Sequence, residues 1–438
     1  MASTTGRGQD DKVEQIKRLD MAVSKVIGRR IWKDTYPKSL RNLIVLFVLT
    51  WFIPRPIYFI VGSLEITPQR IVGIILFLDI LFRRRIKWSW VDIVALGSFL
   101  TIFICTMMSV GSGRAIESTG RSMLDLLAPY LIGRSIAEHP AMLRWMVRFI
   151  LYCLALLAPL LALESFSRFN IHCLLWDVPY TPHPVVRLGV TRAQGWTSHA
   201  IMLGLTYAAF AAPAATFALE GTKQSLKKWL VFGLILSGVF FSISTGAWCT
   251  AFVALALLCW DRYGLGSRKA RWQIGAMCAI GGYLALEVLA NAPLGLALMY
   301  HIRFLSQGWL YRWQLWERVT SVMPGHWLLG YGEALPEEFT GGSGWSVDNH
   351  YLVLLLTQGW FGLGMWLIFN GVVIWRNIKH AWLKMDDAYT RVLRSFGFSV
   401  IGFLASGLTV AFFSTAAVML FLSMGIAATC ASGLRKWR

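Results

Sequence analysis

Long apolar runs constrain this chain more than any other feature of its sequence. Runs of 17 to 25 apolar residues recur along it, and each is long enough to cross roughly 30 Å of hydrocarbon as a helix. Only 15% of the residues are charged, whereas a soluble domain has about a quarter. The sequence therefore predicts an all-α, polytopic membrane protein with about 12 transmembrane helices. The predicted spans lie near residues 42–61, 66–82, 90–110, 115–133, 141–164, 199–219, 229–244, 246–260, 273–291, 350–375, 394–411 and 412–432.

The apolar stretch 229–260 is too long for one crossing and short for two. Two lysines precede it and four basic residues follow it closely. Because basic residues mark the cytoplasmic ends of membrane helices, both ends of the stretch are expected inside the cell. We therefore expect two short helices that turn near Ser244-Thr245-Gly246.

The positions of Lys and Arg set the predicted orientation. With the N-terminus inside, 32 of the 42 Lys and Arg residues, including all 13 lysines, fall in predicted cytoplasmic segments. The net charge of +19 therefore reflects topology and does not indicate a nucleic-acid partner. The expected organisation is a basic cytoplasmic segment 1–41, without the apolar core of a signal peptide, a single transmembrane domain 42–434 and a cytoplasmic tail 435–438.

Two long outer loops are expected, residues 165–198 after the fifth span and residues 291–349 after the ninth. Long loops between spans are commonly functional. Arginine, and no lysine, occurs on the outer side or within the membrane. A planar guanidinium binds oxyanions with two parallel hydrogen bonds, so this pattern favours a phosphate or carboxylate site. The ten arginines are Arg55, Arg70, Arg114, Arg121, Arg168, Arg187, Arg192, Arg303, Arg312 and Arg318.

The second outer loop contains the stretch richest in chemistry, which is predicted to be a helix that starts at Ser306. Three tryptophans would share one face of it, with Arg312 at the edge of that face. Such a face suits stacking on sugar rings beside a bound anion. An interfacial helix anchored by tryptophan at the level of the lipid headgroups is the alternative. The three residues are Trp309, Trp313 and Trp316.

His350 lies where the second outer loop enters a predicted span, directly after Asp348 and Asn349. A half-dehydrated imidazole can take a proton near neutral pH, and Asp348 would orient it. His350 is therefore a candidate base or acceptor-orienting group. The alternative is a structural histidine at the mouth of the span.

Residues 187–199 close the first outer loop, and they contain Arg187, Arg192 and a turn at Gly195. Two arginines and a glycine turn at a helix start can cradle a phosphate group. Simple packing of the loop is the alternative.

The fourth predicted span carries several charged residues. Glu117, Arg121 and Asp125 follow one another at i,i+4 spacing, which predicts a ladder of ion pairs on one helix face. A substrate groove is the alternative.

Short motifs in both outer loops resemble those of the O-antigen ligase and Wzy-type polysaccharide polymerase superfamily. Residues 192–195, Arg-Ala-Gln-Gly, are similar to its exopolysaccharide polymerases. The chain departs from the family at the turn Ser244-Thr245-Gly246, where members often carry Ser-Arg-Gly. The remaining motifs are Arg-x-x-x-Trp (Arg312, Trp316), Gly-x-Gly (Gly330, Gly332) and Asn-His-x-x-Leu, here ending in Val353-Leu354, followed by glycines (Asn349, His350, Gly359, Gly362).

The resemblance implies a GT-C-like, metal-independent glycosyltransferase without a cofactor, located in a bacterial inner membrane with its active site in the periplasm. The donor would be an undecaprenyl-diphosphate-linked oligosaccharide. The acceptor would be a lipid-linked glycan for a polymerase, which we favour, or lipid A core for a ligase. A transporter or flippase and a non-catalytic scaffold are further alternatives. The expected catalytic residues are His350 and Arg312, and the expected substrate-binding residues are Arg192, Arg187, Arg303, Trp309, Trp313, Trp316, Asp348 and Asn349.

Overall fold

The computed structural model confirms that the chain is mostly helical. It describes residues 38–54, 57–61, 64–83, 86–176, 186–187, 189–221, 225–264, 266–267, 269–278, 306–339, 346–382 and 387–429. The β structure within these residues consists of two short antiparallel hairpins. They are formed by β1 (Phe59–Val61) with β2 (Leu64–Ile66), and by β3 (Val186–Arg187) with β4 (Val190–Thr191).

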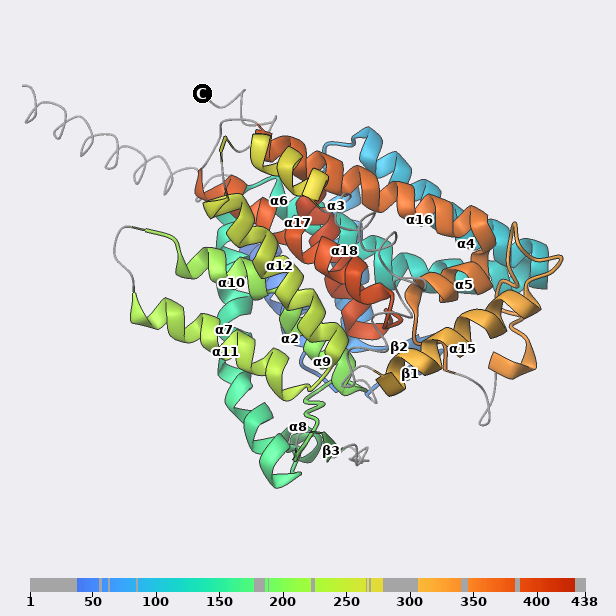
Figure 1. The fold of residues 1–438 in the computed structure, drawn as a ribbon, viewed down its shortest axis with the longest axis horizontal. Coiled ribbons are helices and arrows are strands. Elements are labelled where there is room, and N and C mark those ends of the chain that lie inside the picture. Colours follow the sequence, from blue (N-terminus) through green and yellow to red (C-terminus); the bar gives the residue numbers. More distant parts are fainter. Residues whose placement is uncertain are drawn as a thin grey trace, which may run out of the picture. The chain divides into compact units, whose positions relative to one another are not determined.

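Helices occupy most of the predicted apolar segments (Figure 1). Contacts within the chain define two units, Met1–Leu49 and Thr50–Arg438. The predicted span 273–291 lies mostly outside the described residues. The helices are α2 (Lys38–Thr50), α3 (Pro68–Phe82), α4 (Trp90–Val110), α5 (Ser112–Ser122), the π-helical turn η1 (Met123–Leu127), α6 (Ala128–Ala137), α7 (Pro140–Ser167), α8 (Ile171–Leu175), α9 (Ala200–Ala209), α10 (Ala211–Ala218), α11 (Leu226–Phe241), α12 (Thr245–Tyr263), α15 (Ser306–Val322), the 3-10 turn η2 (Glu337–Phe339), α16 (His350–Trp382), α17 (Ala388–Gly407) and α18 (Ser414–Ala428).

Four helical segments of the described residues are long and apolar enough to cross a membrane. They are Trp90–Val110, Pro140–Ser167, Ala200–Ala218 and His350–Lys379. Helix α18 is also apolar but shorter. These segments support the interpretation of the chain as a membrane protein. The full set of about 12 membrane crossings stays a prediction.

The break expected in the apolar stretch 229–260 is present. Helix α11 ends at Phe241 and α12 begins at Thr245. Ser244 caps α12, because its hydroxyl accepts a hydrogen bond from the backbone N–H of Ala247 at 3.5 Å. Two helices therefore replace the single long one, as the flanking charges predicted.

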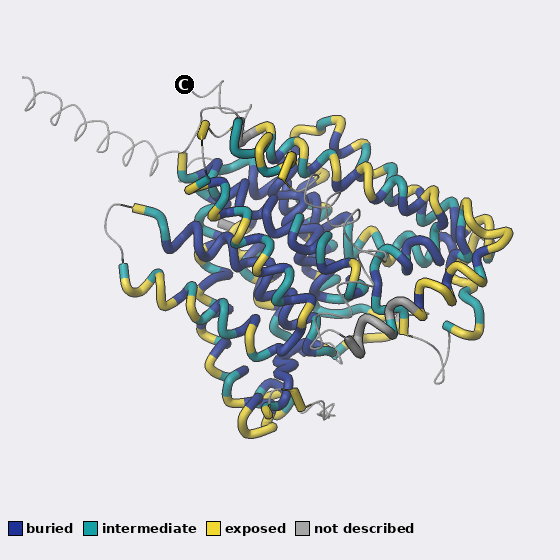
Figure 2. Tube along the Cα trace, in the orientation of Figure 1, coloured by how far each residue is buried: buried dark blue, intermediate teal, exposed yellow. Residues whose placement is uncertain are grey.

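Helices α6, α9, α10, α17 and α18 are deeply buried in the second unit (Figure 2). Glycines allow neighbouring backbones to touch here: a Cβ on Gly133 of α6 would meet the Leu422 carbonyl of α18, and one on Gly425 would meet the Tyr130 carbonyl. Such close contact between small residues is how apolar helices gain packing energy when both are surrounded by hydrocarbon.

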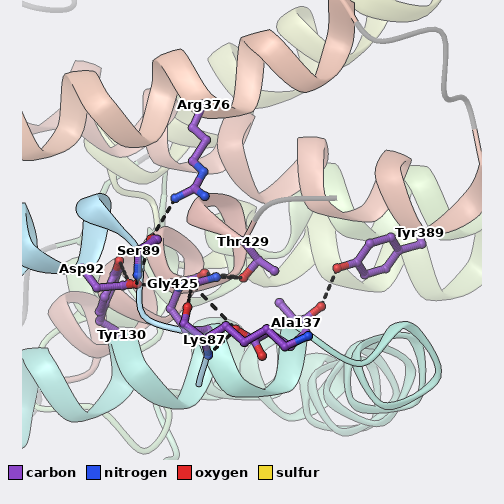
Figure 3. Close-up of polar contacts among 11 residues, drawn as sticks. Lys87, Ser89, Asp92, Tyr130, Ala137, Arg376, Tyr389, Gly425 and Thr429 are labelled. Atoms are coloured by element: carbon purple, nitrogen blue, oxygen red, sulfur yellow. Dashed lines mark hydrogen bonds and ion pairs between the residues drawn. The ribbon is translucent and has the colours of Figure 1, made fainter. Parts of the chain in front are cut away.

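A buried polar network joins α4, α6 and the C-terminal end of α18 (Figure 3). Its centre is an ion pair between Asp92 of α4 and Arg134 of α6, with 2.9 Å between Arg134 Nε and Asp92 Oδ1. Arg134 also donates to Thr429 Oγ1 at 2.9 Å and to the Lys87 carbonyl at 3.1 Å. The Tyr130 hydroxyl donates to Asp92 at 2.7 Å. Every oxygen of Asp92 and every nitrogen of Arg134 therefore has a partner.

Two further hydrogen bonds attach α16 and α17 to the same end. Arg376 donates to the Ser89 hydroxyl at 3.0 Å, and the Tyr389 hydroxyl donates to the Ala137 carbonyl at 2.5 Å. The network therefore fixes one end of five helices, α4, α6, α16, α17 and the C-terminal end of α18. The turns at their opposite ends hold the candidate site.

We expect Arg134→Ala to destabilise the protein by about 3–5 kcal/mol, because it leaves the Asp92 carboxylate buried without a cation. Both side chains are almost fully buried, at 3% and 0% exposure. Thermal unfolding of the detergent-purified protein measures the effect. Arg121→Ala is the matched control, since it breaks an i,i+4 pair with Glu117 in which Arg121 is 44% exposed and such pairs contribute below about 1 kcal/mol. Equal losses in the two variants would contradict the role of the network.

Candidate functional site

Three turns at the end opposite the Asp92 network contact one another in series. The backbone N–H of Ala193 donates to the Phe241 carbonyl at 2.9 Å, which joins the turn before α9 to the turn between α11 and α12. A Cβ on Gly246 would lie 2.5 Å from Val410 Cγ2, which joins the second turn to the one between α17 and α18. The backbone N–H of Phe412 in that last turn donates to His350 Nδ1 at 3.4 Å. The predicted residues Arg192 and His350 therefore lie on one continuous set of turns.

His350 begins α16 and is half-buried among aromatic rings. Its ring centroid lies 4.6 Å from that of Phe412 and 5.1 Å from that of Trp366. It lines a cavity of about 510 Å³, partly open to solvent, whose other walls include Phe99, Leu354 and Phe421. An imidazole in so apolar a cavity is poorly solvated, which favours its neutral form.

The hydrogen bond from Phe412 determines which ring nitrogen of His350 carries the proton. Because Nδ1 accepts, the neutral ring carries its hydrogen on Nε2. Nε2 is then a donor toward a ligand and holds no lone pair with which to remove a proton. The geometry therefore favours the acceptor-orienting role over the role of a base.

Asp348 and Asn349 have structural partners in place of the ligand contacts expected from the sequence. The Asp348 carboxylate accepts from Ser346 Oγ at 2.8 Å, whereas His350 is oriented by Phe412. The Asn349 side chain caps α16 by accepting from the Leu352 N–H at 3.2 Å, and it donates to a carbonyl at the end of α17. Asn349 is 1% exposed. It therefore contributes to the site by fixing the position of His350.

Arg192 is a buried cation without a carboxylate partner among the described residues. Its Nε donates to the Ser242 carbonyl at 3.1 Å. Burial, and then the neighbouring charge of Arg187, lower its pKa to about 10. The other buried arginines, Arg134 and Arg394, each face an aspartate. Since a buried charge without a counter-ion is unfavourable, a bound anion would stabilise the Arg192 guanidinium.

The glycine turn next to Arg192 is held by an acidic residue that the sequence analysis missed. Glu164, in the last turn of α7, accepts from the backbone N–H groups of Gln194 and Gly195 at 3.0 and 2.9 Å. These two amides are therefore occupied by a carboxylate, which favours the packing alternative for the glycine turn and leaves Arg192 as the cation available to an anion. A lone acidic residue at the end of an apolar span was the available signal.

The Gly-x-Gly motif has a structural role in a break of α16. Gly359 interrupts this helix with φ of 62°, which leaves backbone groups without helical partners. The segment after α15 supplies them: Tyr331 N–H donates to the Leu356 carbonyl at 2.7 Å, and Trp360 N–H donates to the Trp327 carbonyl at 2.8 Å. A Cβ on Gly330 would lie 2.6 Å from the Leu356 oxygen. Only glycine allows this pairing.

The predicted helix in the second outer loop is confirmed as α15, which starts at Ser306. Among the side chains of α15 that the structure describes, Leu315 and Val319 are fully covered, whereas Trp316 is 39% exposed. The structure does not describe the remaining expected site residues of this loop. Arg303 and the side chains of Trp309, Arg312 and Trp313 lie outside the described residues.

The predicted ion-pair ladder is correct only in its first step. Arg121 pairs with Glu117 at 2.9 Å, but Asp125 pairs with Arg70 of α3, at 2.5 Å. The reason is that Asp125 lies in the π-helical turn η1, whose wider turn changes the angular spacing of the residues. Asp125 and Arg70 line a second cavity.

Sequence comparison with protein-family models and with curated proteins finds no match. The resemblance to the ligase and polymerase superfamily therefore depends on the motifs alone. Among the described residues, no three His, Cys, Asp or Glu side chains are grouped as metal ligands would be.

Gly330→Ala tests the pairing between the loop and the broken helix. Its φ of 69° and the nearby Leu356 oxygen should together cost about 3 kcal/mol of stability. Gly325→Ala is the matched control, because Gly325 has φ of 84° but nothing within 4 Å of an added Cβ. It should lose only about 1–2 kcal/mol from the left-handed backbone. Thermal unfolding compares them, and equal losses would show that the close contact does not constrain the fold.

Proposed function

We propose that this protein is a metal-independent glycosyltransferase that uses an undecaprenyl-diphosphate-linked glycan as donor on the outer side of the membrane, and that it acts as a Wzy-type polysaccharide polymerase. The observation that carries the proposal is the buried Arg192 guanidinium, which has no carboxylate partner among the described residues and lies on the same set of turns as His350. Transfer from a lipid diphosphate requires a cation that stabilises the leaving diphosphate. It also requires a polar group, here in an apolar cavity, that positions the substrate.

The position of Arg192 supports the motif resemblance where the sequence departs from it. Members of the superfamily often carry an arginine at the position of Thr245, which here is exposed at the start of α12. Arg192 donates to Ser242 in the same turn. Its guanidinium therefore supplies a positive charge within a few residues of the place where the family arginine is missing, with Arg187 close enough to affect its pKa.

In the proposed reaction, an acceptor hydroxyl attacks the anomeric carbon of the donor. The bond to the diphosphate breaks, the diphosphate keeps the electron pair of that bond, and it takes up the hydroxyl proton. Arg192, assisted by Arg187 and by Arg312 of α15, balances the charge on the leaving diphosphate. The Nε2–H of His350 holds a substrate oxygen in position. The apolar side chains around His350 disfavour water, which would otherwise compete with the acceptor.

The assay that tests this function gives the purified protein only a lipid-linked repeat unit. A polymerase should produce a ladder of longer lipid-linked glycans. If no product forms until lipid A core is added, and the glycan is then transferred in one step, the protein is a ligase. If the repeat unit is moved between leaflets of a vesicle without any change in its length, the protein is a transporter and the enzyme proposal is wrong.

Two variants in the same assay separate the roles of His350. His350→Ala should lower the rate by on the order of 10²-fold, because it removes the hydrogen-bond donor that holds the substrate oxygen. His350→Gln should retain activity within about ten-fold of wild type, since the glutamine amide also donates a hydrogen bond but cannot act as a base. Equal loss in both variants would favour the base role. Full activity in both would exclude His350 from the reaction.

The pH dependence of anion binding tests Arg192. In wild type, binding of inorganic pyrophosphate should persist until the pH approaches the Arg192 pKa of about 10 and fall above it. Lysine has an ordinary pKa of about 10.4, and the same burial would lower it to about 8. Arg192→Lys should therefore bind pyrophosphate at pH 7 and lose it by pH 9. Isothermal titration calorimetry measures this, with Arg121→Lys as the control that keeps the wild-type profile. An unchanged profile in Arg192→Lys would show that the anion binds elsewhere.

A further inference from the structure

A second cavity, of about 590 Å³ and partly open to solvent, lies on the other side of α18 from His350. Neighbouring residues separate the two cavities. Asp125 of η1 lines the second cavity, and its neighbour Leu126 lines the cavity of His350. On α18, Thr415 lines the second cavity and Ala417 lines the cavity of His350. The two cavities therefore lie back to back, with η1 and α18 as the wall between them.

The charges of the second cavity are unlike those around Arg192. Arg70 binds Asp125 through two parallel hydrogen bonds, at 2.8 and 2.5 Å, and Glu65 also lines the cavity. The net charge of the lining is thus −1, which disfavours a phosphate. Both Asp125 oxygens already accept from a guanidinium, which disfavours a metal cation. Each oxygen keeps a second lone pair for a neutral donor such as a hydroxyl group.

The cavity also offers an aromatic wall and an unused donor. Trp196 lines it and is 2% exposed, and its indole N–H has no hydrogen-bond partner among the described residues. A buried N–H of this kind is usually satisfied by a ligand or by water. Hydroxyl groups come from Thr67, Ser414 and Thr415, and apolar surface comes from Ile57, Pro54 and Pro68. Carboxylates, hydroxyls and an aromatic ring around a small cavity match the alternating polar and apolar faces of a sugar ring.

We propose that this second cavity binds one neutral sugar residue, and that this sugar is the accepting end of the glycan. Binding of a neutral sugar follows from the cavity alone, whereas its role as acceptor rests on the proposed glycosyltransferase function. The acceptor is then held apart from the donor: its hydroxyls meet Asp125, Glu65 and Thr415, and the anionic diphosphate meets Arg192. Opposite local charge keeps the acceptor sugar in the second cavity and the diphosphate at Arg192.

The test is retention of the fluorescently labelled, full-length protein in detergent on an array of immobilised neutral and acidic oligosaccharides. Wild type should be retained on neutral glycans in preference to acidic ones. Asp125→Asn and Thr415→Val should lower this retention at least about ten-fold. Glu117→Gln is the matched control, because Glu117 also pairs with an arginine but does not line the cavity. It should bind like wild type.

Glu65→Gln keeps the result interpretable if Asp125→Asn unfolds, since the backbone carbonyl of Glu65, which accepts from Arg70, remains in the variant. Retention on acidic glycans only, retention on none, or wild-type retention of Asp125→Asn, Thr415→Val and Glu65→Gln would each overturn the proposal. Transfer assays distinguish it from the proposed function. If neutral sugars bind through Asp125 but no glycan is ever transferred, sugar binding in the cavity is supported and the glycosyltransferase proposal is wrong. If transfer occurs and the KM for acceptor is unchanged in these variants, the glycosyltransferase proposal is supported and the second cavity is not the acceptor site.

Discussion

A carboxylate and a guanidinium can leave water together only when every remaining donor and acceptor also finds a partner. Asp92 and Arg134 meet this condition through Tyr130, Thr429 and the Lys87 carbonyl, which come from different parts of the chain. The pair and its partners therefore hold α4, α6 and the C-terminal end of α18 at hydrogen-bonding distance from one another. Because α18 has 15 residues, its first turn is placed about 22 Å from this network. That first turn is where the two cavities are separated, so the position of the site depends on the distant ion pair.

The buried arginines show how the chain separates stability from function. Arg134 and Arg394 each face an aspartate within the fold. Arg192 faces only a carbonyl among the described residues, and a neighbouring arginine lowers its pKa further. An unsatisfied buried cation is unfavourable for folding, and Glu164 offsets part of that effect by fixing the loop beside it. Binding of an anion would remove the remaining cost, and in the proposed function this free energy would contribute to binding of the donor diphosphate.

The parts of this fold that could be predicted are those that depend on local patterns. The lengths of apolar runs predicted most of the described helices, flanking charges predicted the break before α12, and a capping residue predicted the start of α15. The missed features are pairings between distant segments. Nothing near Asp125 indicates that a π-helical turn directs it to Arg70, and nothing near Gly330 indicates that Gly359 breaks α16. The tautomer of His350 likewise depends on a backbone group 62 residues away.

The turn between α17 and α18 brings the two halves of the proposed chemistry together. Phe412 contacts His350 through its N–H and its ring, and it lines the apolar cavity. Two residues later, Ser414 begins α18 with φ of 53° and lines the polar cavity. A serine in this left-handed conformation is strained, and such strain persists only where the surrounding structure enforces it. The bend at Ser414 places Phe412 and Ser414 on the linings of different cavities. The proposed reaction therefore depends on one strained turn, whose residues line both the cavity proposed for the acceptor sugar and the cavity of His350.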